Sequence, residues 1–185
     1  MDMTLDQTTP YQLTADSQDY LRVVALTSNQ SDDNLLYTHF PADGKGKGNA
    51  RVRLVARVAN LWQAEDVVKQ YNANVFIVDH QAIRDENGGE ALMELIRRLR
   101  FKAESPVITV GVCYSPAWVR NFEQMGTLMT LNGPLNGMEL QRLIEELPIA
   151  MNHAMQERLA PEYIPKFGGE AVGNIQSTRW KSQKI

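Results

Sequence analysis

Val75-Phe76-Ile77-Val78-Asp79-His80 decides the fold of this chain, because four apolar residues, mostly β-branched, end on a carboxylate. A run this short and fully apolar predicts a strand buried on both faces, as in a parallel sheet covered by helices. Open parallel sheets place their chemistry at the carboxyl ends of the strands, which is where Asp79 falls. Asp79 is therefore either a functional carboxylate or the cap of the turn that opens the polar segment Gln81–Gly89.

The rest of the chain repeats the same alternation of strand and helix. Apolar runs predict four further strands, at residues 21–26, 51–58, 106–112 and 128–131. The charged and apolar alternation of 51–58 is typical of a strand near a sheet edge. Apolar residues at helical spacing predict helices between and after the strands, with starts near Asp32 or Asp33 as cap, Leu61, Leu92, Pro116 and Leu140. Five such alternations predict an α/β fold, a parallel sheet with helices on both faces.

The length of 185 residues fits one domain with tails. We expect a flexible N-terminal arm over 1–20 and the folded domain over 21–147. The apolar helical spacing continues past Pro148, where proline should kink or split the helix, so 148–160 is expected to be a helical extension. Residues 161–185 have the composition of a linker toward a possible following domain.

Composition excludes several classes of function. The formal net charge is −3, so there is no basic excess for nucleic acid. No apolar run approaches the roughly 18 residues of a membrane span, and residues 1–20 lack the pattern of a secretory signal. Cys113 is the single cysteine, and the three histidines are scattered, which favours neither a metal centre nor an enzyme. We therefore expect a cytoplasmic protein without enzymatic activity, metal or membrane insertion, whose partners are proteins.

The order and spacing of these elements resemble the receiver domain of two-component response regulators. Ala73–Asp79 is similar to the phosphoacceptor strand of that family, Pro106–Gly111 to its fourth strand, and Gly126–Pro134 to its fifth. The resemblance covers roughly Leu21 to Leu147. It implies a CheY-like, flavodoxin-like sheet of five parallel strands in the order 2-1-3-4-5, with Asp79 at the phosphoacceptor position.

The chain departs from the family at every other position of the phosphorylation site. Thr27 and Ser28 stand where the family has an acidic pair that helps to hold Mg²⁺, and Asp32 and Asp33 are not expected to replace that pair. Gly111 stands for the family's Ser/Thr, and Gly133 for the lysine that precedes a proline, here Pro134. Losing one electrostatic partner of phosphoryl transfer typically costs ~10²–10³ in rate. We therefore expect an atypical receiver that is not phosphorylated, with no cofactor unless a working Asp79 site binds Mg²⁺.

The C-terminal Trp180–Ile185, after the linker, resembles the arrangement in the CpaE/TadZ group, where a degenerate receiver precedes a ParA/MinD-like ATPase. This resemblance implies a regulatory module for protein interaction or self-association, in signal transduction or in localisation for pilus assembly. One alternative is a functional phosphoacceptor of a two-component phosphorelay that uses Asp79. Another is a small-molecule site, with the ligand over Asp79 and in the space left by Gly111 and Gly133.

Two further expectations concern self-association and stability. The apolar stripe of the last helix runs beyond the length needed to cover the sheet, so it either folds back on its own domain or pairs with a second copy. The resemblance also places a meeting surface on the fourth helix, the fifth strand and the fifth helix, so the interface candidates of a homodimer are Trp118, Leu147, Met151, Ala154, Met155 and Leu159. A metal-free Asp79 is expected to be partly unpaired, so that Asp79→Asn would be neutral or stabilising.

Overall fold

Five parallel strands form one sheet in the order β2-β1-β3-β4-β5. The computed structural model describes residues 20–45, 51–83, 88–101 and 106–159. The predicted fold class, the strand order and the edge position of the second strand are confirmed. The strands are β1 (Leu21–Leu26), β2 (Val52–Arg57), β3 (Val75–Asp79), β4 (Ile108–Cys113) and β5 (Met129–Asn132).

The sheet separates two apolar cores because successive side chains of a strand point to opposite faces. Val75 and Ile77 of β3 belong to one core, while Phe76 and Val78 belong to the other. Every residue of β3 is buried, as the apolar run predicts for a central strand. The carboxyl end of β3 therefore delivers Asp79 to the middle of one edge of the sheet.

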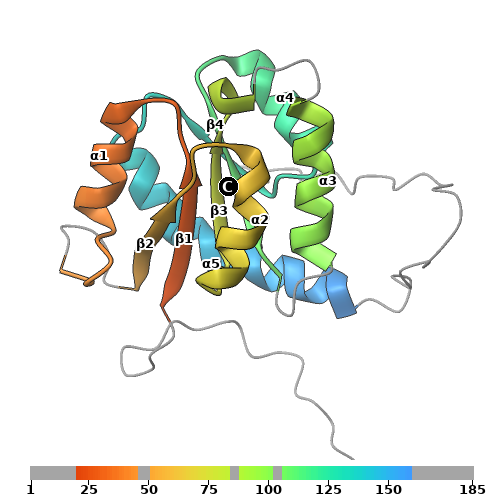
Figure 1. The fold of residues 1–185 in the computed structure, drawn as a ribbon, viewed down its shortest axis with the longest axis horizontal. Helices are drawn as coiled ribbons and strands as arrows, with labels where there is room; N and C mark the ends of the chain where they lie inside the picture. Colours follow the sequence, from red (N-terminus) through yellow and green to blue (C-terminus); the bar gives the residue numbers. More distant parts are fainter. Residues whose placement is uncertain (1–19, 46–50, 84–87, 102–105, 160–185) are drawn as a thin grey trace, which may run out of the picture.

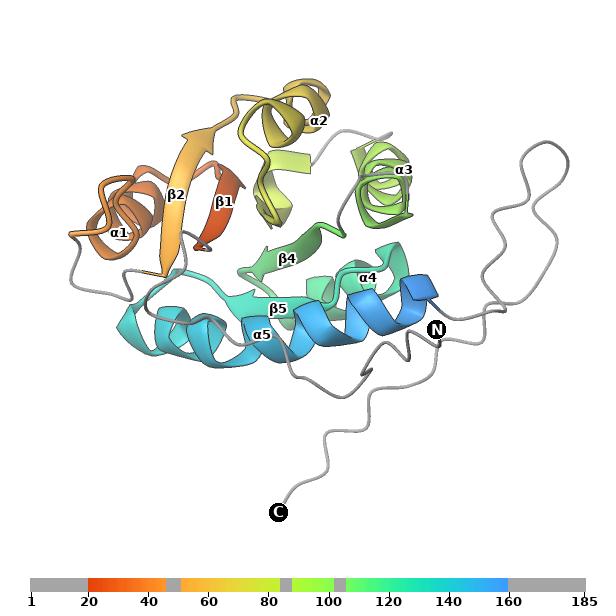
Figure 2. The same ribbon diagram turned by 90° about the horizontal axis from the view of Figure 1, so that it is seen from below.

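Helices cover both faces (Figures 1 and 2). The first core includes residues of α1 and α5, and the second includes residues of α2, α3 and α4. Figure 2 shows α5 beneath the sheet and α2 and α3 above it. The helices are α1 (Gln30–His39), α2 (Leu61–Gln70), α3 (Gly88–Phe101), α4 (Pro116–Met125) and α5 (Gly137–Leu159), with a short 3₁₀ helix η1 at His80–Ile83.

Several predicted boundaries are wrong, for local reasons. Asn29, rather than Asp32 or Asp33, caps α1, since its side chain accepts the amide of Ser31. The segment after Asp79 begins with η1 instead of an open polar loop. β4 ends at Cys113, because its ladder with β5 continues to the pair Cys113 and Asn132. Gly111 therefore lies inside the strand and not at its end.

The last helix runs without interruption through Pro148, so the expected split is wrong. Leu147, Met151 and Ala154 are all buried in the same core as Leu140 and Leu143. Burial of one continuous apolar face on both sides of the proline outweighs the loss of its backbone donor. None of the helices in the described part of the chain is long and apolar enough to cross a membrane. The expected arm over 1–20 and linker over 161–185 fall outside the described residues, except for Tyr20.

Candidate functional site

Asp79 is completely buried, and hydrogen-bond donors occupy both of its carboxylate oxygens. Oδ2 accepts the backbone amide of Ser28 at 3.1 Å and also the Ser28 hydroxyl. Oδ1 accepts the amide of Gln81 at 2.7 Å, in the first turn of η1. The side chain has a relative exposure of 0%. The expectation of a partly unpaired charge is therefore wrong, because backbone and hydroxyl donors stabilise the ionised carboxylate.

Thr27 and Asp33 form a second buried cluster beside Asp79. The hydroxyl of Thr27 donates to Asp33, and the guanidinium of Arg57, from the end of β2, forms an ion pair with the same carboxylate. Burial raises the pKa of Asp33 from its usual value, and the Thr27 hydrogen bond and the Arg57 charge act in the opposite direction. Arg57 is thus the counter-ion of a carboxylate that is only 1% exposed.

Asp32 also lies inside the protein, although it is on the first helix. It accepts the phenol hydroxyl of Tyr114, which follows β4, and the backbone amide of Leu135 at 3.0 Å. Asn29 donates its side-chain amide to the oxygen of Tyr114 at 3.1 Å. Burial and the hydrogen bond to Asp32 raise the pKa of Tyr114 far above its usual value, so this phenol stays a donor. Asp32 therefore joins the loops that follow β1, β4 and β5.

Aromatic rings fill the space beside Gly111 and Gly133, the two glycines that the receiver resemblance places in the site. A methyl group on Gly111 would lie 2.6 Å from the ring of Phe122, and one on Gly133 would lie 2.8 Å from the ring of Tyr114. Gly133 precedes Pro134 through a cis peptide bond. The hypothesis of a small-molecule site in the space left by these glycines is therefore wrong, because the protein's own side chains occupy it.

His80 connects Asp79 to the fourth helix. Its Nδ1 lies 3.2 Å from the backbone amide nitrogen of Tyr114 and 3.4 Å from the backbone carbonyl oxygen of Val112, so the ring joins η1 to the end of β4. The imidazole stacks on the indole of Trp118, with ring centroids 5.0 Å apart. His80 is buried and has a structural role in this arrangement, as is common for an isolated histidine.

A magnesium ion, which the resemblance associates with this position, does not fit the residues present. Mg²⁺ needs carboxylate oxygens that are free to face it together with water molecules. In this structure Asp79 is held by amides and a hydroxyl, Asp32 by Tyr114 and Leu135, and Asp33 by Arg57. Among the described residues, no group of three or more His, Cys, Asp or Glu side chains is placed to hold a metal ion.

The thiol at the end of β4 is not a nucleophile. Cys113 is buried, and burial, followed by the charges of Asp79 and Glu123, raises its pKa to about 11. At neutral pH it remains a thiol and packs as an apolar side chain.

The interface candidates do not share one exposed face. Leu147, Met151 and Ala154 are buried in the protomer's own core, and Trp118 packs on His80. Met155 is exposed, and the side chain of Leu159 lies outside the described residues. Of the two outcomes left open for the long helix, packing on its own domain accounts for these buried positions.

Solved structures resemble this arrangement over the whole sheet. The receiver domain of the TMAO respiratory system response regulator TorR is 17% identical with a TM-score of 0.54, over 71% of this chain and 98% of that chain. The signal receiver domain of the putative response regulator NarL from Mycobacterium tuberculosis is 14% identical, with a TM-score of 0.54 and coverage of 71% and 98%. The chain has the receiver-domain fold.

A further structure with the receiver fold is a putative pilus assembly-related protein from Burkholderia pseudomallei. It is 15% identical, with a TM-score of 0.53, over 72% of this chain and 93% of that chain. No family model matches the sequence. No curated protein matches it either.

Sequence reasoning placed Asp79 and Ser28 together correctly at the carboxyl edge of the receiver fold, but it missed their neighbours. The sequence pattern does not predict the contacts of Asp32, Tyr114 or Arg57. These three reach the site from α1, from the end of β4 and from the end of β2. Asp32 and Tyr114 follow predicted strands, where polar residue types are a signal for a site, whereas Arg57 falls inside the predicted strand 51–58 and carries no such signal.

Proposed function

We propose that this domain is an atypical receiver that acts through protein interaction or self-association, without phosphorylation of Asp79. The observation that carries the proposal is the enclosure of Asp79 by Ser28 and Gln81. A carboxylate that attacks a phosphodonor needs one oxygen free and an open line of approach. Asp79 has no open line of approach, since it is fully buried, and both of its oxygens already accept hydrogen bonds.

The electrostatics of the site support the same conclusion. Catalysis of phosphoryl transfer is mainly positioning plus positive charge around the equatorial oxygens of the transferred group. The cation at this edge that the described contacts reveal, Arg57, is committed to Asp33. At the position where the resemblance implies a lysine, Gly133 lies under the ring of Tyr114. The site is therefore a hydrogen-bonded network that connects the loops at the strand ends.

The biological setting is a narrower part of the proposal. The sequence resembles the degenerate receivers of the CpaE/TadZ group, and one structure with the same fold is a putative pilus assembly-related protein. Together these favour a cytoplasmic role in signal transduction or in localisation for pilus assembly. In that role the receiver fold would present a constant surface instead of one switched by a phosphoryl group.

Intact-mass spectrometry after treatment with acetyl phosphate and Mg²⁺ tests the proposal. We expect no gain of one phosphoryl group in the wild type under conditions that label a working receiver treated in parallel. Ser28→Ala is the informative variant, because it removes the hydroxyl from Asp79 and leaves the backbone amide in place. We expect it to remain unlabelled as well, since it supplies no metal ligand or lysine.

The outcome that would overturn the proposal is substantial labelling of the wild type that disappears in Asp79→Ala. That result would establish the alternative, a phosphoacceptor of a two-component phosphorelay. Labelling that persists in Asp79→Ala would lie on another residue and would leave the proposal standing.

A further inference from the structure

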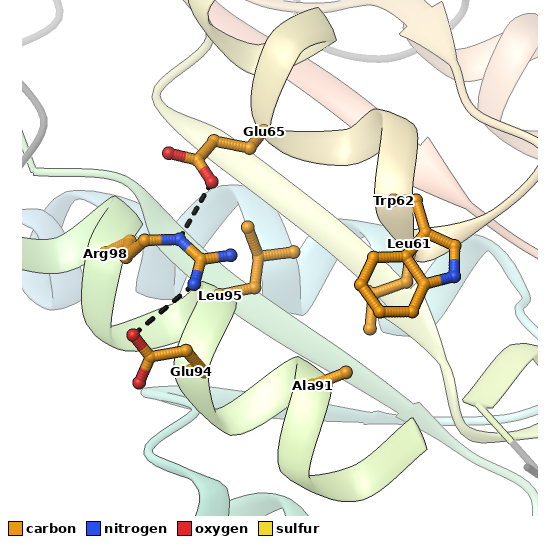
Figure 3. Close-up of a pocket in the computed structure, with 7 residues that line it drawn as sticks. All are labelled: Leu61, Trp62, Glu65, Ala91, Glu94, Leu95 and Arg98. Carbon is orange, nitrogen blue, oxygen red and sulfur yellow. Dashed lines mark hydrogen bonds and ion pairs between the residues drawn. The ribbon is translucent and has the colours of Figure 1, made fainter. Parts of the chain in front are cut away.

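A shallow groove of about 170 Å³ lies between α2 and α3 (Figure 3), on the face of the sheet opposite α5 (Figure 2). Its apolar part is formed by Leu61, Ala91 and Leu95. The groove is separate from the site around Asp79, because helix surfaces form the groove, whereas the loops at the strand ends form the site. None of the described residues that contact Asp79 lines the groove.

Trp62 stands at one end of the groove without filling it (Figure 3). Its side chain is 84% exposed, the highest value among the large apolar residues that the structure describes. Burying a tryptophan removes ~150–250 Å² from water, so leaving one beside an open apolar hollow forgoes a considerable gain. Such a residue is the type most enriched at the energetic centres of protein interfaces.

Arg98 lies at the opposite end of the groove (Figure 3). Its Nε donates to Glu65 of α2 at 2.8 Å, and its NH1 group donates to Glu94 at 3.3 Å. These two contacts hold the guanidinium plane in place while the side chain remains 34% exposed. A fixed, partly exposed guanidinium is a good platform for an aromatic ring, because it stacks with little further loss of entropy.

From this arrangement we infer that the groove is a self-association surface whose occupant is a second copy of this chain. A two-fold axis through the middle of the groove exchanges its ends, so Trp62 of each copy meets Arg98 of the other. The indole then covers the partner's apolar hollow, and its face lies on the guanidinium in a cation–π contact. Complementarity between the two ends of one groove is what an isologous interface requires.

The area that the groove can bury sets the expected strength of dimerisation. Two tryptophans account for ~300–500 Å², whereas stable specific interfaces bury about 1,200–2,000 Å² in total. The exposed sides of α2 and α3 must supply the rest, and they carry charges such as Lys69 and Arg97. We therefore expect a reversible dimer at micromolar concentrations and not an obligate one.

The inference rests on the proposed function, to which it adds a second copy of the chain as the partner. The two proposals can nevertheless be disproved separately. Phosphoryl labelling is read by mass, and dimerisation is read by sedimentation without any phosphodonor. A strictly monomeric chain would remove the groove inference and leave the absence of phosphorylation untouched. Labelling of Asp79 would do the reverse.

Sedimentation velocity of the full 185-residue chain from low to high micromolar concentration is the test. We expect a concentration-dependent dimer in the wild type. Trp62→Lys removes the indole and opposes Arg98 with a like charge. Since symmetry removes two contacts at once, the Kd should rise by about a hundredfold. Trp62→Tyr keeps an aromatic face and should retain most of the association.

Met138→Glu on α5 is the matched control, because Met138 is 83% exposed and lies away from the groove. It should leave the dimer unchanged. A wild type that stays monomeric at high micromolar concentration overturns the inference, and so does a dimer that tolerates Trp62→Lys. Loss of the dimer in Met138→Glu alone would place the interface on α5. Thermal melts of each variant show whether any loss of association comes from unfolding.

Discussion

Ser28 donates both its backbone amide and its hydroxyl to the same oxygen of Asp79, across 51 residues of sequence. With Gln81 on the other oxygen, this contact turns the carboxylate at the end of β3 into a structural acceptor. A buried acceptor that is fully paired contributes to stability, whereas its loss leaves buried donors unsatisfied. The site can therefore be probed through stability as well as through chemistry.

We expect Asp79→Asn to destabilise the fold by about 1–3 kcal/mol in a thermal or urea melt. An asparagine offers one oxygen to donors on both sides, so its NH₂ group must face either Ser28 or Gln81. Asp66→Asn, on the exposed side of α2, is the control and should change stability by less than about 0.5 kcal/mol. An unchanged or higher melting temperature for Asp79→Asn would show that the three donors are not needed.

Gly111→Ala should destabilise the protein by about 1–3 kcal/mol, because its methyl group would collide with the ring of Phe122. Combining it with Phe122→Leu should cost less than the sum of the two single changes, since the smaller side chain makes room. Gly137→Ala is the matched control, because nothing lies within 4 Å of the added methyl group. Additive losses in the Gly111 and Phe122 pair would argue against their contact.

Arg57→Met tests the buried ion pair through pH. Burial raises the pKa of Asp33, so the folded state holds this proton more tightly than the unfolded chain, and the ionised carboxylate weakens the fold as pH rises. Arg57 offsets that cost only while Asp33 is ionised. We expect a loss of about 3 kcal/mol at pH 7 that shrinks as the pH falls through the pKa of Asp33.

Arg142→Met serves as the control for that experiment. Arg142 pairs with Glu146 and Glu139 on the surface of α5, so its loss should cost less than about 1 kcal/mol. Chemical denaturation at several pH values measures both variants. A loss in Arg57→Met that stays constant with pH would mean that Arg57 acts by packing and not by charge.

Pro148→Ala should stabilise the domain by up to about 3 kcal/mol, because it restores the backbone donor missing from the middle of α5. Pro148→Gly restores the same donor but adds backbone freedom, so it should be about 1 kcal/mol less stable than the alanine variant. Circular dichroism melts rank the three proteins. A less stable alanine variant would show that the proline ring itself packs usefully.

The sequence was sufficient to predict the strands and helices, because the patterns that indicate them lie within short segments of the chain. Val75–Asp79 is apolar at every position before the carboxylate, as expected for a strand covered on both faces. Helical spacing likewise located α2, α3 and α4 to within a few residues. The predicted end of β4 at Val112 was one residue short because Cys113 continues the ladder, and pairing with β5 decides where the strand stops.

The receiver resemblance predicted Asp79 at the edge of the sheet, but it misjudged how its charge is satisfied. From the sequence alone, a carboxylate without a metal or a lysine nearby appears unpaired, because every residue except proline has a backbone amide and the amides therefore give no sequence signal. The amide of Gln81 points at Asp79 only because η1 begins directly after β3. Local conformation, rather than residue type, supplied that donor.

The sequence by itself determined the alternation of elements, the position of Asp79 and the loss of the charged residues around it, because these depend on residue type and spacing along the chain. Only the tertiary structure decided that Asp32 bonds Tyr114, that Arg57 neutralises Asp33, and that Met151 and Ala154 are core. Each of these contacts joins residues from different elements. Their partners are chosen by how the helices pack on the sheet, and packing is a property of the whole fold.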